Sequence, residues 1–276
     1  MALFTDLFGL NKPKKKSRPD EPERDVPKIN RAECPAGGRE HRDAFIKIIK
    51  QLSYRHRIWK VWNDFIVMFA CAISNSVDKT NYDEREELYL KTIRNYTNED
   101  QSLFPKLVAE TVMALDMNME QDFLGSIYME LGLGNNAVGQ VFTPYDVCRL
   151  MAQVTTTNAC SQVRDKGYVT INDCTCGAGA TLIAGIHEVR KQLKHMNLNF
   201  QNHVLVAAQD IDYTTALMCY IQLSLLGVAA YVKVGNSLTE PMCSSDTLEN
   251  YWFTPMYFSD VWKMRRLFHG KEFLLQ

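Results

Sequence analysis

Apolar residues in the first half of the chain recur at intervals of three and four positions, the spacing of one face of an α-helix. The pattern runs in separate segments from about residue 44 to residue 133, and Gly132 and Gly134 end the last of them. It predicts an N-terminal helical domain over residues 40–135. An aromatic stripe at this spacing is typical of a buried core, so these residues are assigned no chemistry: Ile58, Trp59, Trp62, Phe65, Ile66, Phe69, Phe123, Leu124, Ile127, Tyr128 and Leu131.

The pattern changes after Gly139. The run Thr143-Pro144-Tyr145-Asp146 predicts a helix start, with Thr143 as the N-cap, Pro144 at the first position and Asp146 in a capping-box position. The apolar face of this helix is marked by Val147, Leu150, Met151 and Val154.

Strands rich in β-branched residues then alternate with helical segments. We expect strands over 168–172, 203–209 and 230–234, and helices over 180–194 and 214–226. This alternation indicates βαβ units and a parallel sheet, so the predicted fold class is α/β, a Rossmann-like sheet over residues 136–276 behind the helical domain. The sheet is expected to be truncated, since little chain follows the third strand. Residues 1–39 are predicted to form a flexible tail.

Composition and charge narrow the classes of partner. The chain has 276 residues, 46% of them hydrophobic, with 31 basic and 32 acidic residues and a formal net charge of −1. Any contact with nucleic acid must therefore come from a local patch. The basic run at residues 12–18 is a solvated tail or else a phosphate contact or targeting signal, and the basic end at 263–271 is expected to be a surface helix.

The cysteines and apolar runs bear on compartment, metal and membrane. The eight cysteines are scattered and no signal peptide is evident, which indicates free thiols in a reducing, cytoplasmic compartment. Cys174 and Cys176 form a C-x-C, but no second pair stands at zinc spacing, so no metal site is expected. No window of about 18 uncharged apolar residues exists, so no membrane span is predicted.

Polar residues follow each of the three predicted strands, where ligands bind in open parallel sheets. The turn Asp173-Cys-Thr-Cys-Gly-Ala-Gly179 can bring its backbone close to a ligand, and its leading carboxylate suits an ammonium group. Asp210 can accept the hydroxyls of a ribose, and the amide of Asn236 can pair with an adenine. Alone, a glycine pair is usually a tight turn, an Asp a helix cap and an Asn a turn residue. Together they describe a site for S-adenosyl-methionine.

Four stretches carry a resemblance to a known family. These are Asp122 to Glu130, Gly139-Gln-Val-Phe-Thr-Pro144, Asp173 to Gly179, and Gln209-Asp210-Ile-Asp212. With them the chain resembles the adenine-specific (N-6) DNA methyltransferases, most closely the modification subunit of type I restriction systems. The resemblance implies S-adenosyl-methionine as cofactor, DNA as partner, and a specificity or catalytic partner subunit.

The resemblance also implies roles for individual residues. Phe142, Thr143 and Pro144 would shape the cofactor pocket. Asp173, Cys176, Gly177 and Gly179 would line its methionine end. Asp210 would bind the ribose, with Ile211 and Asp212 against the adenine, and Asn236 stands where the family usually has an Asp near the adenine amino group.

The family's catalytic motif, Asn/Asp-Pro-Pro-aromatic, is degenerate in this chain. In that motif the side chain and a backbone carbonyl accept the hydrogens of the adenine amino group, and the aromatic ring stacks on the flipped base. Asn250-Tyr-Trp-Phe253 keeps the amide and the aromatic, and Thr254-Pro255-Met256-Tyr257 keeps one Pro and the aromatic. The candidate catalytic residues are Asn250, Phe253, Thr254, Pro255 and Tyr257.

Two functions remain open at this point. One is methylation of the adenine exocyclic amino group in DNA by a divergent enzyme. The other is a catalytically inactive, cofactor-binding subunit or regulator of a methyltransferase or restriction-modification complex. Transfer to RNA or protein is a third alternative that the sequence leaves open.

Overall fold

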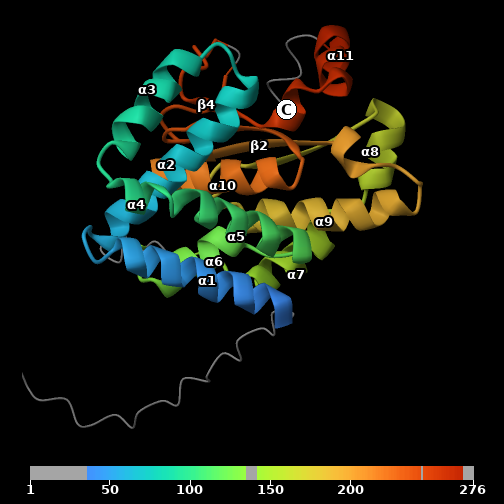
Figure 1. Ribbon diagram of the computed structural model, residues 1–276. Coiled ribbons are helices and arrows are strands. Elements are labelled where there is room, and N and C mark those ends of the chain that lie inside the picture. Colours follow the sequence, from blue (N-terminus) through green and yellow to red (C-terminus); the bar gives the residue numbers. More distant parts are fainter. Residues whose placement is uncertain (1–35, 135–141, 244, 270–276) are drawn as a thin grey trace, which may run out of the picture. The chain divides into compact units, whose positions relative to one another are not determined.

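The computed structural model describes residues 36–134, 142–243 and 245–269. Residues 1–35 of the expected tail lie outside this range, whereas 36–39 belong to the first helix. The N-terminal half of the described chain is helical, as its periodicity predicts (Figure 1). Its helices are α1 (Ala36–Leu52), α2 (Ile58–Val77), α3 (Tyr82–Ile93), α4 (Asn98–Gln101), α5 (Phe104–Met117) and α6 (Phe123–Glu130).

Aromatic residues fill the core between these helices. The ring of Phe45 meets those of Trp62, Phe65 and Phe123 edge to face, at centroid distances of 5.9, 5.4 and 5.6 Å. All four side chains are buried. The aromatic stripe of the sequence is therefore largely core, although Trp59 is 52% exposed.

The described residues of the second half form a four-stranded sheet in the order β1-β2-β3-β4. β1 (Val169–Asp173), β2 (Val204–Asp210) and β3 (Ala229–Val234) are parallel, and β4 (Tyr251–Phe253) runs antiparallel to β3. The α/β class is thus confirmed. The observed bounds of β1 and β2 differ from the predicted ones by one residue at both ends, and β3 begins one residue earlier than predicted. β4 was not expected, because a strand of three residues is too short to show an alternating pattern.

Different elements cover the two faces of this sheet. α9 (Ala180–Lys194) and α10 (Tyr213–Leu225) pack on one face. The other face buries a separate cluster that includes Tyr257 of the 3-10 turn η2 (Pro255–Phe258) and Trp262 of α11 (Asp260–His269). The remaining helical elements are α7 (Tyr145–Thr155), α8 (Ala159–Lys166) and the 3-10 turn η1 (Phe200–Asn202).

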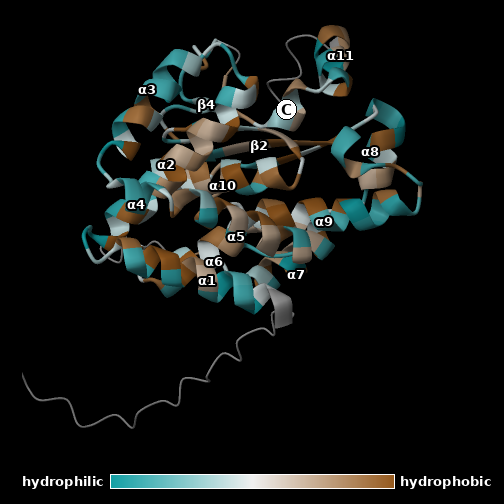
Figure 2. Ribbon diagram, viewed as in Figure 1, coloured by the Kyte–Doolittle hydropathy of each residue, from teal (hydrophilic) through white to brown (hydrophobic). Residues whose placement is uncertain are grey.

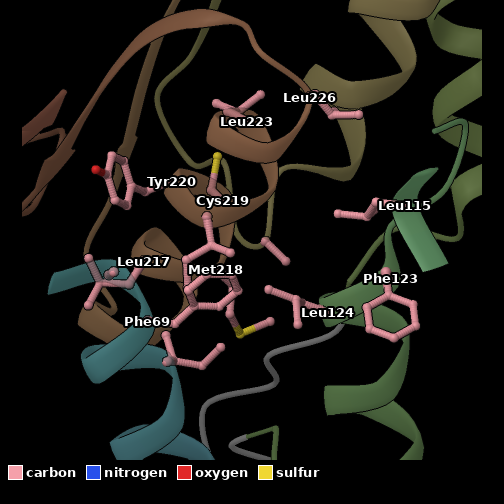
Figure 3. Close-up of a cluster of buried hydrophobic side chains, with 14 of the residues drawn as sticks. Phe69, Leu115, Phe123, Leu124, Leu217, Met218, Cys219, Tyr220, Leu223 and Leu226 are labelled. Atoms are coloured by element: carbon pink, nitrogen blue, oxygen red, sulfur yellow. The ribbon is translucent and has the colours of Figure 1, made fainter. Parts of the chain in front are cut away.

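α10 joins the helical half to the sheet. It packs against α2 and α6 on one side and against β2 and β3 on the other, and apolar residues run along both α2 and α10 (Figure 2). Side chains from α2, α5 and α6 converge on it, including Phe69, Leu115 and Leu124 (Figure 3). A helix enclosed in this way is buried on nearly all sides, which explains why its residues from Thr215 to Leu223 are all buried.

α7 differs from its expected form in two respects. It begins at Tyr145 with Pro144 in the cap position and without a side-chain cap hydrogen bond, so the N-cap is Pro144, not the Thr143 that the sequence predicted. It packs on α9 through Cys148 and Ala152, while its apolar stripe is turned outward. The exposed fractions of Val147, Leu150, Met151 and Val154 are 46, 63, 49 and 70%. Within the described residues, no helix is long and apolar enough to cross a membrane.

Candidate functional site

The polar residues that follow β1, β2 and β3 lie at one end of the sheet. Because the three strands are parallel, their carboxyl ends coincide, with Asp173 in register with Ala208 and Asp210 with Val234. We call this region the carboxyl end of the sheet. The sequence prediction that Asp173, Asp210 and Asn236 follow neighbouring strands at a common end is realised in the structure.

The turn after β1 depends on two glycines in the left-handed region. Gly177 has φ +52° and Gly179 has φ +96°. A Cβ on Gly179 would stand 2.9 Å from Sγ of Cys219, and one on Gly177 would stand 3.4 Å from the ring of Phe142. The backbone conformation therefore strains a side chain at both positions, and at Gly179 the Sγ of Cys219 also stands too close for a Cβ.

Asp210 connects the ends of the first two strands. Its Oδ2 accepts the N–H of Gly177 at 2.7 Å, and its Oδ1 accepts the N–H of Asp212 at 2.9 Å and the hydroxyl of Thr215 at 3.2 Å. A carboxylate has about four acceptor sites, so about one remains free. Asp210 is only partly buried, and that acceptor can face a ligand.

Asp173 and Cys176 have different surroundings in the same turn. Asp173 accepts the N–H of Thr175 at 3.0 Å and the hydroxyl of Thr181, and it remains partly exposed. Cys176 is buried, and a hydrogen bond to Cys219 together with burial raises the pKa of its thiol well above the usual value. Cys176 is therefore a neutral packing group at physiological pH and is poorly suited to act as a nucleophile.

The loop after β3 is held to the end of β2. The N–H of Gly235 donates to the backbone oxygen of Asp210 at 2.9 Å, and the amide of Gln209 donates to the oxygens of Gly235 and Glu240 at 3.2 and 2.9 Å. Asn236 itself accepts the N–H of Leu238 at 2.9 Å, as a turn residue does. Its amide nitrogen is the part that stays available for a ligand within the described residues.

The other predicted cofactor residues surround this turn. Asp212 caps α10 by accepting the N–H of Thr215 at 2.9 Å, and Ile211 beside it is 69% exposed. Phe142 stacks on Tyr128 with a centroid distance of 5.6 Å, and its ring would lie 3.4 Å from a Cβ on Gly177. Thr143 and Pro144 are exposed. Residues 139–141 of the same segment lie outside the described residues.

A buried polar group behind the turn was not anticipated from the sequence. The amide of Gln222 donates at 2.8 Å both to Oδ1 of Asp122 and to the backbone oxygen of Ala178, and its oxygen accepts the N–H of Leu124 at 3.1 Å. Burial raises the pKa of the Asp122 carboxyl. These bonds fasten the start of α6 to the turn after β1, over a separation of 100 residues between Asp122 and Gln222.

The candidate catalytic residues are divided between the two ends of the sheet. Asn250 is exposed at the carboxyl end, where its backbone oxygen accepts the N–H of Val234 at 2.9 Å. Since β4 runs antiparallel to β3, the chain then moves towards the opposite, amino end of the sheet. Phe253 is in register with Tyr231, and Thr254 donates its N–H to Ala230 at 3.0 Å, about 13 Å along β3 from Val234.

The residues at this amino end are part of the core. The Thr254 hydroxyl is fully buried, accepts the N–H of Ala230 at 2.8 Å and donates to the oxygen of Val228 at 2.6 Å. Tyr257 is buried against Tyr231, and the Arg266 guanidinium lies 4.0 Å from its ring centroid. Phe253 and Pro255 belong to this amino end as well, away from Asp210. Of the five candidate catalytic residues, Asn250 is therefore the one that lies at the same end of the sheet as Asp210.

The described part of the chain has neither a cluster of metal-binding side chains nor a disulfide. No three or more His, Cys, Asp or Glu side chains are placed there to hold a metal ion. The seven described cysteines, Cys174 and Cys176 included, are free thiols.

The model of the N-6 DNA Methylase family matches residues 119–275, from just before α6 to beyond α11, which is more than half of the chain. No curated protein matches it. The matched region contains the turn after β1, the ends of β2 and β3, and β4. On this match, the chain belongs to the N-6 DNA methylase family.

Proposed function

We propose that the chain binds S-adenosyl-methionine at the carboxyl end of the sheet and takes part in methylation of the adenine exocyclic amino group in DNA. One observation supports this above the others. The side chain of Asp210, at the end of β2, is hydrogen-bonded to Gly177 in the turn after β1. The two candidate halves of the cofactor site are thereby held together, as a ligand that spans both strands requires.

The turn after β1 fits the methionine part of this cofactor. Gly177 and Gly179 allow the tight left-handed backbone of this turn, and the partly exposed carboxylate of Asp173 complements an ammonium group. We assign Cys176 to the wall of this part, with Phe142, Thr143 and Pro144 in front of it. When bound, S-adenosyl-methionine supplies an electrophilic methyl group.

The ends of β2 and β3 fit the nucleoside part. Asp210 retains about one acceptor site, so it can bind a ribose hydroxyl without giving up its bond to Gly177. The exposed side chain of Ile211 offers an apolar surface for adenine, and the amide nitrogen of Asn236 can donate to a ring nitrogen. Asp212 borders the adenine but is already engaged as the cap of α10.

The acceptor side of the reaction is less complete. Asn250 is exposed at the carboxyl end, where its amide oxygen can accept a hydrogen from an adenine amino group and so direct the nitrogen lone pair outward. The aromatic residues that the family motif would place beside it are in the core. This favours a second candidate function, in which the chain is the cofactor-binding subunit or regulator of a methyltransferase or restriction-modification complex such as a type I system.

Cofactor binding can be tested at a residue that does not support the fold. Ile211 is 69% exposed, so Ile211→Ser should leave the thermal unfolding temperature unchanged. If adenine packs there, calorimetry should show about a 5- to 30-fold weaker affinity for S-adenosyl-methionine. Leu238→Ser, on the neighbouring loop and 91% exposed, is the matched control and should bind normally. Absence of binding to the unsubstituted protein would reject the proposal.

Methyl transfer separates the two candidate functions. The assay uses labelled S-adenosyl-methionine and mixed-sequence DNA, with RNA and protein as competing acceptors. Transfer to adenine that falls about 100-fold or more in Asn250→Ala, with cofactor affinity retained, supports the enzyme. Cofactor binding without transfer supports the non-catalytic subunit. Preferential labelling of RNA or protein would contradict DNA as the substrate.

A further inference from the structure

Trp59 is the exposed member of the four tryptophans, all of which lie in the described part of the chain. It is 52% exposed, whereas Trp62, Trp252 and Trp262 are 0, 4 and 0% exposed. Trp59 precedes Trp62 by three residues and Asn63 by four, so the three side chains share one side of α2. That side faces the protein, because Trp62 is buried. The indole of Trp59 is therefore directed towards the protein without being covered by it.

α2 lies beside α10 (Figure 1). The hydroxyl of Thr214, at the start of α10, donates to Oδ1 of Asn63 at 3.2 Å. Further along both helices, Tyr220 lies beside Ser74. The two helices therefore run in the same direction, away from the end of β2 that α10 follows. Trp59 comes one turn, or about 6 Å, before Asn63, so it lies beyond the start of α10 and beyond the carboxyl end of the sheet.

A row of aromatic rings joins α2 to the turn after β1. The ring centroids of Trp62 and Tyr128 are 5.7 Å apart, and Tyr128 stacks on Phe142. The ring of Phe142 in turn would lie 3.4 Å from a Cβ on Gly177. Because Trp59 stands one turn beyond Trp62 on the same side of α2, its indole continues this row outward from the proposed cofactor site.

The start of α10 also contacts β4. The ring of Tyr213 meets that of Trp252 at a centroid distance of 6.4 Å. Asn250, two residues before Trp252, is exposed at the carboxyl end of the sheet. Trp59 and Asn250 therefore both lie near the start of α10, one on α2 and the other before β4.

The chain around Trp59 carries positive charge. Between Asp43 and Asp64 the sequence has five Lys and Arg residues and no acidic residue. Arg57, directly before α2, is exposed and takes part in no ion pair among the described residues. The stretches outside the described residues do not complement this charge, since the first 35 residues hold eight basic and six acidic ones and the shorter stretches have no excess of acidic residues. A strand with phosphates fits this surface better than the undescribed parts of the chain.

From these observations we infer that Trp59 is the residue on which the acceptor adenine stacks, with Arg57 at a phosphate of the same strand; this rests on the proposed function and names the surface that the acceptor contacts. Phe253 and Tyr257, the aromatic residues of the motif candidates, are buried at the amino end and offer no face to a base. An exposed indole supplies that face, because stacking needs only one open side of an aromatic ring. Trp59 thus provides the stacking partner for the base whose amino group Asn250 would bind.

Trp59 gives its own fluorescence signal in the full chain, because the other three tryptophans are buried. Acrylamide should quench part of the emission of the protein alone, and Trp59→Phe should abolish that part. Emission without a quenchable part would mean that other residues of the chain cover Trp59, which overturns the inference.

The probe for stacking is a short abasic DNA strand with a single adenine, and its control is the same strand without the base. An unpaired adenine needs no flipping out of a duplex, so stacking is measured alone. The adenine strand should shield Trp59 from acrylamide, and the abasic strand should not. Equal shielding by both strands, or by neither, would overturn the stacking role.

Matched variants separate stacking from charge. Trp59→Ala should weaken affinity for the adenine strand about tenfold, and Trp59→Tyr should restore most of it. Phe268→Ala removes an exposed aromatic residue of α11 and should have no effect. Arg57→Gln should weaken both strands alike and reduce the slope of log affinity against log salt by about 0.7, unlike Lys263→Gln on α11. Unchanged affinity in Trp59→Ala would overturn stacking, and an unchanged slope in Arg57→Gln would overturn the phosphate contact.

S-adenosyl-methionine also carries an adenine, so it is tested separately. Trp59→Ala should bind this cofactor as tightly as the unsubstituted protein, and the cofactor alone should leave Trp59 open to acrylamide. The opposite results would assign the indole to the cofactor and overturn the inference. Strand binding is measured without cofactor, so a protein that stacks adenine on Trp59 but binds no S-adenosyl-methionine would reject the proposed cofactor site alone.

Discussion

Polar residues at the carboxyl end of the sheet differ from those at the amino end in exposure and in hydrogen bonding. At the carboxyl end, Asp173, Asp210 and Asn236 are partly exposed and bonded mainly to N–H groups of neighbouring turns. At the amino end, Thr254 is fully buried and bonded across to β3, and Tyr257 is packed in the core. A polar residue beside a strand can therefore bind a ligand at the carboxyl end, where it is partly exposed, but not at the amino end, where it is buried.

Strand direction decides to which end a motif belongs. Residues that follow β1, β2 or β3 lie at the carboxyl end of the sheet, because these strands are parallel. β4 is antiparallel, so the residues before it lie at the carboxyl end and those after it at the amino end. The two degenerate candidates for the catalytic motif, which begin at Asn250 and Thr254, therefore start at opposite ends of the sheet although they are four positions apart in sequence.

The largest effect is expected at the amino end. Tyr257→Ala removes a buried ring that contacts Tyr231, Phe253 and Arg266, and it should lower the free energy of unfolding by about 3–5 kcal/mol. Urea denaturation measures the loss, and Tyr257→Phe, which keeps the ring, is the control. The folded fraction should bind S-adenosyl-methionine with unchanged affinity. A variant that kept its stability but lost methyl transfer would restore Tyr257 to the catalytic set.

An intermediate effect is expected at the carboxyl end. Gly179→Ala places a Cβ 2.9 Å from Sγ of Cys219 at a residue with φ +96°, and we expect about 1–3 kcal/mol of destabilisation together with weaker cofactor binding. Thermal unfolding and calorimetry report the two losses. Adding Cys219→Ala should recover only part of the stability, since it relieves the contact but not the backbone strain. Full recovery, or a stable Gly179→Ala variant, would contradict this description of the turn.

Local patterns in the sequence predicted most helices and strands, but they did not predict how distant segments pair or pack. Periodicity and the preceding glycine predicted the helix Ala180–Lys194 to the residue, and the strand ends placed Asp173, Asp210 and Asn236 together. β4 is a strand because it pairs with β3, and its direction cannot be read from three aromatic residues. The apolar stripe of α7 predicted a helix but not that the stripe faces outward.

The smallest effect on stability is expected at the buried Asp122, which Gln222 links to Ala178 in the turn after β1. Burial raises the pKa of its carboxyl in the folded protein. The proton is therefore held more tightly by the folded state, which gains stability below the ordinary pKa of 3.8 and loses that gain as pH rises through the folded pKa. Asp122→Asn keeps the oxygen that accepts from Gly125 and Gln222 but cannot ionise. Its unfolding temperature should exceed that of the unsubstituted protein at pH 7 and match it in acid.

The opposite sign is expected for Asp246, which makes it the control. Hydrogen bonds from Cys243, Lys233 and Tyr251 lower the pKa of the Asp246 carboxyl, so its stabilising contribution is present above 3.8 and is lost as pH falls through the lowered value. Asp246→Asn should reduce the unfolding temperature at pH 7, with a difference that shrinks in acid. If Asp122→Asn instead lowered the unfolding temperature at pH 7, the ionised carboxylate would be stabilising the start of α6, and the turn at Ala178 would be supported by charge rather than by the neutral bonds of Gln222.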